Sequence, residues 1–214
     1  MIKREMKIDR MTSRELGGRF VERWLALELA NTIRNDGSGG LADHLATVEQ
    51  TARWLAEQDG LPVPDEAEVD ESFRCELVEL RAAVRALFAR AVSPRPASRA
   101  DAGRLMPVRQ ALARLNEAAA REPVVPCLDW PEGAAPSVRL LSAEADPRIR
   151  VLGALARDAV EFLSGPCAAH LRSCTAPRCV RYFVKSHGRQ EWCKPSCGNR
   201  ARAARHYRRR QAPA

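Results

Sequence analysis

The chain has 214 residues, of which 45% are hydrophobic and 29% charged, and its formal net charge is +8. This length and composition predict one medium-sized globular domain with a small appendage. Neither a secretory signal nor an apolar stretch of about 18 residues is present, so a cytoplasmic protein with reduced thiols and no membrane contact is expected.

Helical periodicity dominates the first 120 residues. Residues 1–15 are charged and lack a period, so they are expected to be flexible. Apolar side chains then recur at intervals of three or four residues, which predicts four successive helices. A glycine-rich loop follows the first helix, and Thr47 is expected to cap the second. The four helices are predicted over 20–33, 47–58, 70–92 and 101–120.

The spacing of the apolar residues changes after residue 120. Two short apolar runs over 124–130 and 137–142, joined by a turn rich in proline and glycine, predict one β-hairpin. A last helix is predicted over 147–163, with a proline at its first position. Residues 164–166 are expected to form a hinge. Residues 16–164 are therefore predicted to form one domain that is mainly α with one β-hairpin.

Two groups of side chains are expected in the core of this domain. The fourth helix is expected to turn its leucine and valine residues inward: Leu105, Val108, Leu112 and Leu115. Free cysteines are among the most buried residue types. The three cysteines without a neighbour in the sequence are therefore expected to be buried as well: Cys75, Cys127 and Cys167.

The other four cysteines are the most informative feature of the chain. They follow the pattern C-x4-C-x13-C-x3-C and are Cys174, Cys179, Cys193 and Cys197. Two close pairs joined by a short loop place four thiolates around one tetrahedral Zn²⁺. Four sulfur ligands leave no open position, so we expect one structural zinc ion and no catalytic metal. A weaker alternative replaces one cysteine by His170 or His187.

Aromatic residues accompany the cysteines in a small domain predicted over 168–214. Tyr182, Phe183 and Trp192 are expected to form its miniature core. Stacking of nucleic-acid bases on Tyr182 or Phe183 is the alternative. Because so few apolar residues cannot stabilise a fold alone, zinc is expected to determine whether this domain is folded.

The C-terminal segment is strongly basic. Residues 172–214 hold 12 lysines and arginines and one acidic residue, so their net charge is +11, whereas the rest of the chain carries −3. A helix is predicted to begin near Ser196, with Ala203 and Tyr207 packed against the zinc site. A solvated tail is the alternative, but the cysteines favour a fold. A cationic helix suits a polyanion. The residues expected to contact DNA are Asn199, Arg200, Arg202, Arg205, His206, Arg208 and Arg209.

Two motifs resemble known families. Cys197-Gly198-Asn199-Arg200, preceded by Trp192-Cys193, resembles the CGNR zinc finger. Residues 25–32, Leu-Ala-Leu-Glu-Leu-Ala-Asn-Thr, resemble the opening of the ABATE domain, which usually precedes this finger in bacterial proteins described as stress-induced transcription regulators. The resemblance covers nearly the whole chain.

This resemblance implies a zinc-dependent DNA-binding transcription regulator whose N-terminal domain senses a small ligand or dimerises. The candidates to line a ligand pocket are Trp24, Glu28, Asn31 and Thr32. Under the alternative interpretation, Trp24 is a core residue and Asn31 and Thr32 only end a helix. One small finger binds DNA weakly, so a homodimer or a partner subunit is expected.

Three other functions are weighed against DNA binding. An RNA-binding or ribosome-associated zinc protein would use the same charge and aromatic residues. An enzyme with an accessory finger would need a cleft containing His44, Asp43 and Glu28, whose spacing matches no catalytic arrangement, so we expect that the protein is not an enzyme. A protein–protein adaptor is the remaining alternative.

Overall fold

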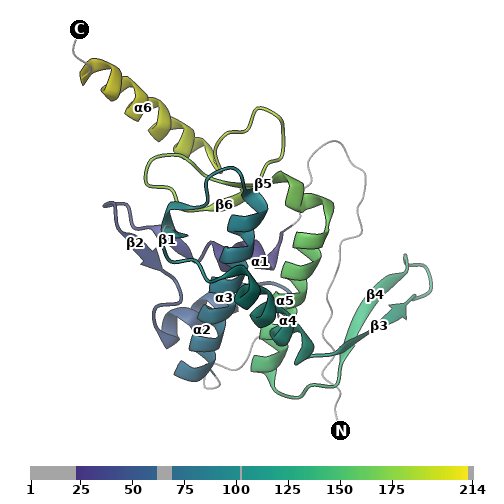
Figure 1. Cartoon of the computed structure of the whole chain (residues 1–214). Helices are drawn as coiled ribbons and strands as arrows, with labels where there is room; N and C mark the ends of the chain where they lie inside the picture. The colour runs from purple at the N-terminus through teal and green to yellow at the C-terminus, as the bar shows by residue number, and fades with distance from the viewer. Residues whose placement is uncertain (1–22, 62–68, 102, 212–214) are drawn as a thin grey trace.

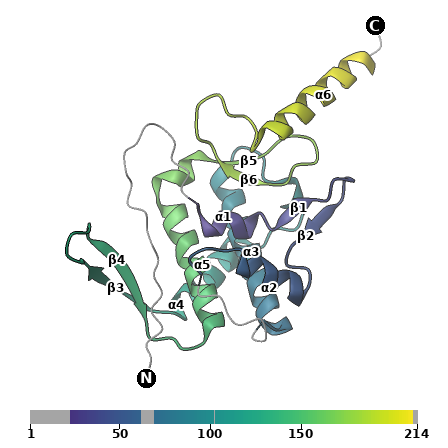
Figure 2. The same ribbon diagram turned by 180° about the vertical axis from the view of Figure 1, so that it is seen from behind.

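The structure is a computed structural model that describes residues 23–61, 69–101 and 103–211. The segment 1–15, expected to be flexible, lies outside the described residues, as do Phe20 and Val21 of the first predicted helix. A helical body lies at the centre, a β-hairpin extends from one side of it, and a long helix projects from the opposite end (Figures 1 and 2). Within the described residues, no helix combines the length and apolarity needed to span a bilayer.

The described residues contain six α-helices and three antiparallel strand pairs. The helices are α1 Leu25–Ala30, α2 Val48–Ala56, α3 Glu71–Val92, α4 Val108–Ala120, α5 Pro147–Ser164 and α6 Pro195–Gln211. The paired strands are β1 Ile33–Asn35 with β2 Leu41–Asp43, β3 Val124–Asp129 with β4 Ser137–Ser142, and β5 Leu171–Ser173 with β6 Tyr182–Val184. Short 3-10 helices span Arg99–Asp101 and Pro166–His170. The predicted class, mainly α with a small zinc-finger domain and a final helix, is confirmed.

Side-chain caps fix the start of three helices. The Thr47 hydroxyl accepts a hydrogen bond from the Gln50 amide, as the sequence predicts for the start of α2. Asp70 caps α3 in the same way, and Asp146 caps α5 immediately before Pro147. Each cap satisfies an amide that has no partner within its helix and stabilises the helix by about 1 kcal/mol.

The core surrounds α3, which packs against α1, α4 and α5. Leu77, Val84 and Phe88 of α3 are completely buried. The rings of Phe88 and Phe162 lie 5.2 Å apart, and the Trp24 ring packs edge-on against Phe162, also at 5.2 Å. Burial of each large apolar side chain contributes about 1.5–3 kcal/mol, so this cluster supplies most of the stability of the body.

The structure corrects several details of the strands and helices. The first helix ends at Ala30, and Ile33 lies in β1, because the loop at 36–40 closes a hairpin. The expectation of a single hairpin was therefore wrong. The fourth helix begins after Pro107, whose backbone is extended, and not at residue 101. A proline has no amide hydrogen to donate and is disfavoured within a helix, so the earlier start is blocked.

Some residues predicted to be buried are exposed. Leu105 precedes α4 and is 41% exposed, and Leu112 is 44% exposed because the inward face of α4 is formed by Ala111 and Leu115. None of the three isolated cysteines is fully buried as expected, although Cys167 packs against the core. The structure places Cys75 on the exposed face of α3 and leaves two others half-buried, Cys127 and Cys167.

The C-terminal segment packs directly against the helical body. Leu171 of β5 and Tyr182 of β6 are buried in the same cluster as Phe88 of α3. The strand pair β5–β6 crosses one end of the bundle formed by α1, α3 and α5 (Figure 1). Residues 164–166 therefore do not act as the expected hinge between separately packed parts.

Candidate metal centre and nucleic-acid interface

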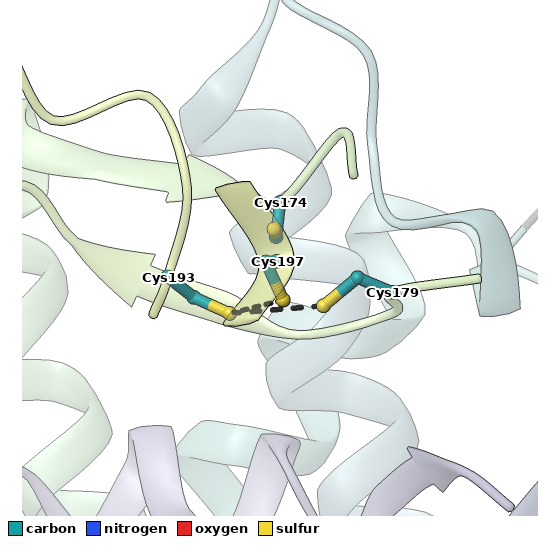
Figure 3. A group of neighbouring side chains, drawn as sticks. All are labelled: Cys174, Cys179, Cys193 and Cys197. Atoms are coloured by element: carbon teal, nitrogen blue, oxygen red, sulfur yellow. Dashed lines mark hydrogen bonds between the residues drawn. The ribbon is translucent and has the colours of Figure 1, made fainter. Parts of the chain in front are cut away.

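Four sulfur atoms meet at one point between β5, β6 and the start of α6. The Sγ atoms of Cys174, Cys179, Cys193 and Cys197 all lie within 4.8 Å of one another (Figure 3). Sγ of Cys193 lies 3.7 Å from that of Cys179 and 3.6 Å from that of Cys197. A tetrahedron with Zn–S bonds of about 2.3 Å has S···S edges of about 3.8 Å. The arrangement thus fits one Zn²⁺ held by these four residues, as predicted, and no histidine belongs to the group.

Backbone hydrogen bonds place the ligands. Cys174 directly follows β5, and its amide donates to the Arg181 carbonyl at 2.8 Å. The Cys179 amide donates to the Ala176 carbonyl at 3.0 Å, and Arg178 between them has φ +62°. This left-handed conformation is uncommon for a residue with a side chain and closes the tight loop between the first two ligands. Cys197 is fixed by the first turn of α6.

The thiols affect each other's ionisation. Hydrogen bonds from Cys179 and Cys193 lower the pKa of Cys174. Hydrogen bonds to Cys174 and Cys179, together with burial, raise the pKa of Cys193. The first thiolate is therefore favoured, while further thiolates are opposed by the charge already present. A divalent cation removes that opposition, and Zn²⁺ with four thiolates has a net charge of −2.

The signature residues after Cys197 support the metal site. The Arg200 guanidinium donates to Sγ of Cys197 at 3.1 Å and is half-buried, so it offsets part of the negative charge of the thiolates. Gly198 is buried beneath the Trp192 ring, and a Cβ atom at Gly198 would lie only 3.0 Å from Cε3 of that ring. Gly198 therefore permits a close approach, and any larger residue here would require the Trp192 ring to shift. The structure assigns Arg200 a contact with sulfur that the sequence did not reveal.

Helix α6 leaves the metal site and has little contact with the body. Its residues from Arg202 to Gln211 are exposed, except for the half-buried Ala204 (Figures 1 and 2). Tyr207 is 65% exposed and Ala203 is exposed too, so the expectation that they pack against the zinc site was wrong. The residues predicted to contact DNA that are exposed here are Asn199, Arg202, Arg205, His206, Arg208 and Arg209.

The aromatic residues are divided between two cores. Phe183 packs with the cysteines, and Trp192 lies partly buried against them, as predicted. Tyr182 instead lies in the core of the body, where its hydroxyl donates to Asp101 at 2.7 Å. Tyr182 and Phe183 are both buried, so neither presents a ring face on which a base could stack.

Three of the four candidates for a ligand pocket make structural contacts, namely Trp24, Asn31 and Thr32. Trp24 packs on Phe162, and Glu28 is half-buried in the short helix α1. Asn31 and Thr32 are buried, and their polar atoms form hydrogen bonds within the protein. A shallow groove between α3 and α4 is lined by other residues, including Glu76, Glu79, Arg114 and Arg121.

Comparison with protein families matches nearly the whole described chain. Residues 24–166 match the ABATE family, whose description is "Putative stress-induced transcription regulator". The chain belongs to the ABATE family. In this ABATE protein, residues 170–210 match the CGNR zinc finger, which contains all four cysteines. The expected pairing of these two families is confirmed. No curated protein matches the chain.

Proposed function

We propose that the protein is a zinc-dependent transcription regulator that binds DNA through α6. The observation that carries this proposal is the combination of an ordered metal site with a basic helix that projects freely from it. The helix has 17 residues and is about 25 Å long, and the major groove of B-DNA admits an α-helix. The exposed residues from Asn199 to Arg209 are then the DNA contacts, most of them to phosphates.

The distribution of charge around α6 supports insertion into a groove. With 100° per residue, Arg202 and Arg209 point in nearly the same direction, while Arg208 and Arg210 lie on opposite flanks. A helix in a groove faces bases with its centre and a phosphate strand with each flank, and α6 has cations in all three places. Arg200 lies behind this surface, against the metal site, and acts by stabilising it.

The same observations weigh on the other functions. Recognition of single-stranded RNA depends on exposed aromatic platforms, and the two candidate platforms Tyr182 and Phe183 are buried. Four sulfur ligands leave no open coordination position for catalysis, so we propose a regulator and not an enzyme. In this proposal the protein acts in the cytoplasm, and its helical body responds to a small effector or forms a dimer. The dimer is expected because one finger alone binds DNA weakly.

The direct test is retention of genomic DNA. Zinc-loaded protein is incubated with sheared genomic DNA at near-physiological salt, and the retained fragments are sequenced. We expect a small number of enriched sites with the wild type and their loss with Cys197→Ser. Uniform retention would reduce the protein to a nonspecific electrostatic binder. Retention of single-stranded RNA in preference to duplex DNA at matched salt would favour the RNA-binding alternative.

The expected dimer has its own test. Sedimentation of the zinc-loaded protein at micromolar concentration, with and without an enriched duplex, gives the number of copies per site. We expect two copies or a partner subunit on each tightly bound site. A monomer that binds a single site tightly would contradict this part of the proposal.

A further inference from the structure

The side chain of Asn31 forms a two-point contact with the zinc finger. Its Nδ2 donates to the Tyr182 carbonyl at 3.0 Å, and its Oδ1 accepts from the Tyr182 amide at 3.0 Å. Asn31 lies directly after α1, 151 positions before Tyr182 in the chain, and is 1% exposed. The amide thus takes the place of a neighbouring strand and satisfies both backbone groups of Tyr182, which would be costly to leave unpaired in the interior.

The side chain of Tyr182 is held from a second direction. Its hydroxyl donates to Oδ2 of Asp101 at 2.7 Å, and Oδ1 of Asp101 is paired with Nε of Arg85 at 2.6 Å. Arg85 also donates to the Ala30 carbonyl, one residue before Asn31, and its guanidinium lies 5.3 Å from the centre of the Tyr182 ring. Arg85 and Asp101 are 3% and 5% exposed, so the whole arrangement is screened from water.

A third group of contacts comes from the loop after α3. The Ser98 hydroxyl donates to the Val180 carbonyl at 2.7 Å and accepts from Arg85 at 3.0 Å. The Ser173 hydroxyl donates to the Pro96 carbonyl at 2.5 Å. Val180 directly follows the ligand Cys179, and Ser173 directly precedes the ligand Cys174. The contacts with the body therefore reach the residues next to two of the four ligands.

We propose that Asn31, Arg85 and Asp101 are positioning residues of the zinc finger. They lock β6 to the helical body, so retention of zinc and placement of α6 both depend on side chains far from the metal. The asparagine of the Asn31-Thr32 motif thus serves to dock the finger and does not line a ligand pocket. Only the step from placement of α6 to DNA affinity rests on the proposed function.

The test compares release of zinc from three full-length proteins. In Asn31→Asp, a carboxylate replaces the Nδ2 donor and faces the Tyr182 carbonyl without a hydrogen to share. Asn35→Asp is the matched control, because Asn35 also donates Nδ2 to a carbonyl, that of Gly40, but in the exposed β1–β2 hairpin. Zinc transfer to a chromogenic chelator is followed at one temperature, and circular dichroism checks that the body stays helical.

We expect Asn31→Asp to release zinc roughly 10- to 100-fold faster, because one buried hydrogen bond is lost and the Tyr182 carbonyl is left unpaired against a carboxylate. Asn35→Asp should release zinc at the wild-type rate. A helical Asn31→Asp protein with wild-type zinc release would overturn the proposal. This result does not depend on DNA, so it separates failure of the docking role from failure of the DNA-binding function.

A milder variant keeps the test decisive if Asn31→Asp does not fold. Tyr182→Phe retains the ring and removes only the hydroxyl that reaches Asp101. We expect zinc release several-fold faster than in the wild type, and Tyr207→Phe, at the exposed tyrosine of α6, should leave it unchanged. Equal zinc release from Tyr182→Phe and the wild type would refute the contribution of the hydrogen bond between Tyr182 and Asp101.

Discussion

The strand pair β5–β6 and helix α6 are attached to the same metal site but have opposite surroundings. The strands are largely buried against the body and held by Asn31, Ser98 and Asp101. Most of α6 is exposed and makes hydrogen bonds only within itself. One zinc site thus connects a surface that docks inward with a surface that is free to bind outward. The difference indicates that the body fixes where the finger lies, whereas α6 determines what it binds.

The largest effect is expected when zinc is removed from the site that β5–β6 and α6 share. Structural zinc contributes roughly 10–16 kcal/mol to small sites, so Cys197→Ser or chelation should unfold α6 and release β5–β6. Because Leu171 and Tyr182 belong to the core of the body, its melting temperature should also fall. Thermal unfolding with and without chelator measures this. An unchanged melting temperature of the body would show that the finger is attached only loosely.

The two tyrosines of the chain provide a matched comparison. Tyr182 is 1% exposed in the docked strand, and Tyr207 is 65% exposed in α6. Truncation of a large buried aromatic side chain costs about 3–5 kcal/mol, whereas a surface change stays within about 0.5 kcal/mol. Urea unfolding of Tyr182→Ala and Tyr207→Ala should show this contrast. Similar losses of stability in both variants would contradict the assignment of the two surfaces.

The charges of α6 should affect binding without affecting stability. Replacement of Arg202, Arg205 and Arg209 by alanine removes three positive charges from the proposed DNA-binding surface and should flatten the slope of log K against log salt by up to roughly three units. The unfolding free energy should stay near that of the wild type. A control with the same loss of charge replaces exposed arginines of the body, Arg53, Arg90 and Arg109, and should leave the slope unchanged. If both triple variants behave alike, α6 is not the binding surface.

The smallest expected effect concerns the stability of the protein at acid pH. It comes from the carboxylate of Asp43, at the edge of the docking contacts. Burial disfavours the charge of Asp43, but the hydrogen bonds and positive charge of Arg81, together with the hydrogen bond from the Leu45 amide, outweigh it and hold the pKa of Asp43 below its usual 3.8. Since this pKa is lowered in the folded state, the stabilisation is present above pH 3.8 and is lost as the pH falls through the lowered value. Urea titrations at several pH values measure how far the unfolding free energy falls in acid. Asp43→Asn should make this fall smaller, and Asp59→Asn, at an exposed carboxylate, should leave it unchanged.

Much of the architecture could be predicted because its signals are local. Thr47 and the Asp70 region mark helix starts through hydrogen bonds within one turn, and the spacing of the cysteines defines a tetrahedral set of ligands. The split between Tyr182 and Phe183 could not be predicted. Neighbouring residues of a strand point to opposite faces, so one enters the body and the other faces the cysteines. A three-residue strand is too short to show which face is which.

Other features depend on tertiary contacts that leave no local pattern. Helical periodicity places Tyr207 on one face of α6, but whether the finger extends far enough to cover that face is not encoded in the period. Likewise, the sequence marks Asn31 as the end of a helix, whereas its partner Tyr182 lies 151 residues away. The Asn-Thr pair after an apolar helix was the available signal, and it allowed two interpretations, the lining of a pocket and the end of a helix, neither of which names the distant partner.

Hydrogen exchange of the zinc-loaded protein can be measured with and without an enriched DNA duplex and again after chelation. We expect DNA to slow exchange only at 199–211, and chelation to accelerate exchange at 171–184, 195–211 and the adjoining amides of 26–32 together. If DNA protected the body and not α6, or if chelation left residues 26–32 unchanged, the division between a docked β5–β6 and a free α6 would be contradicted.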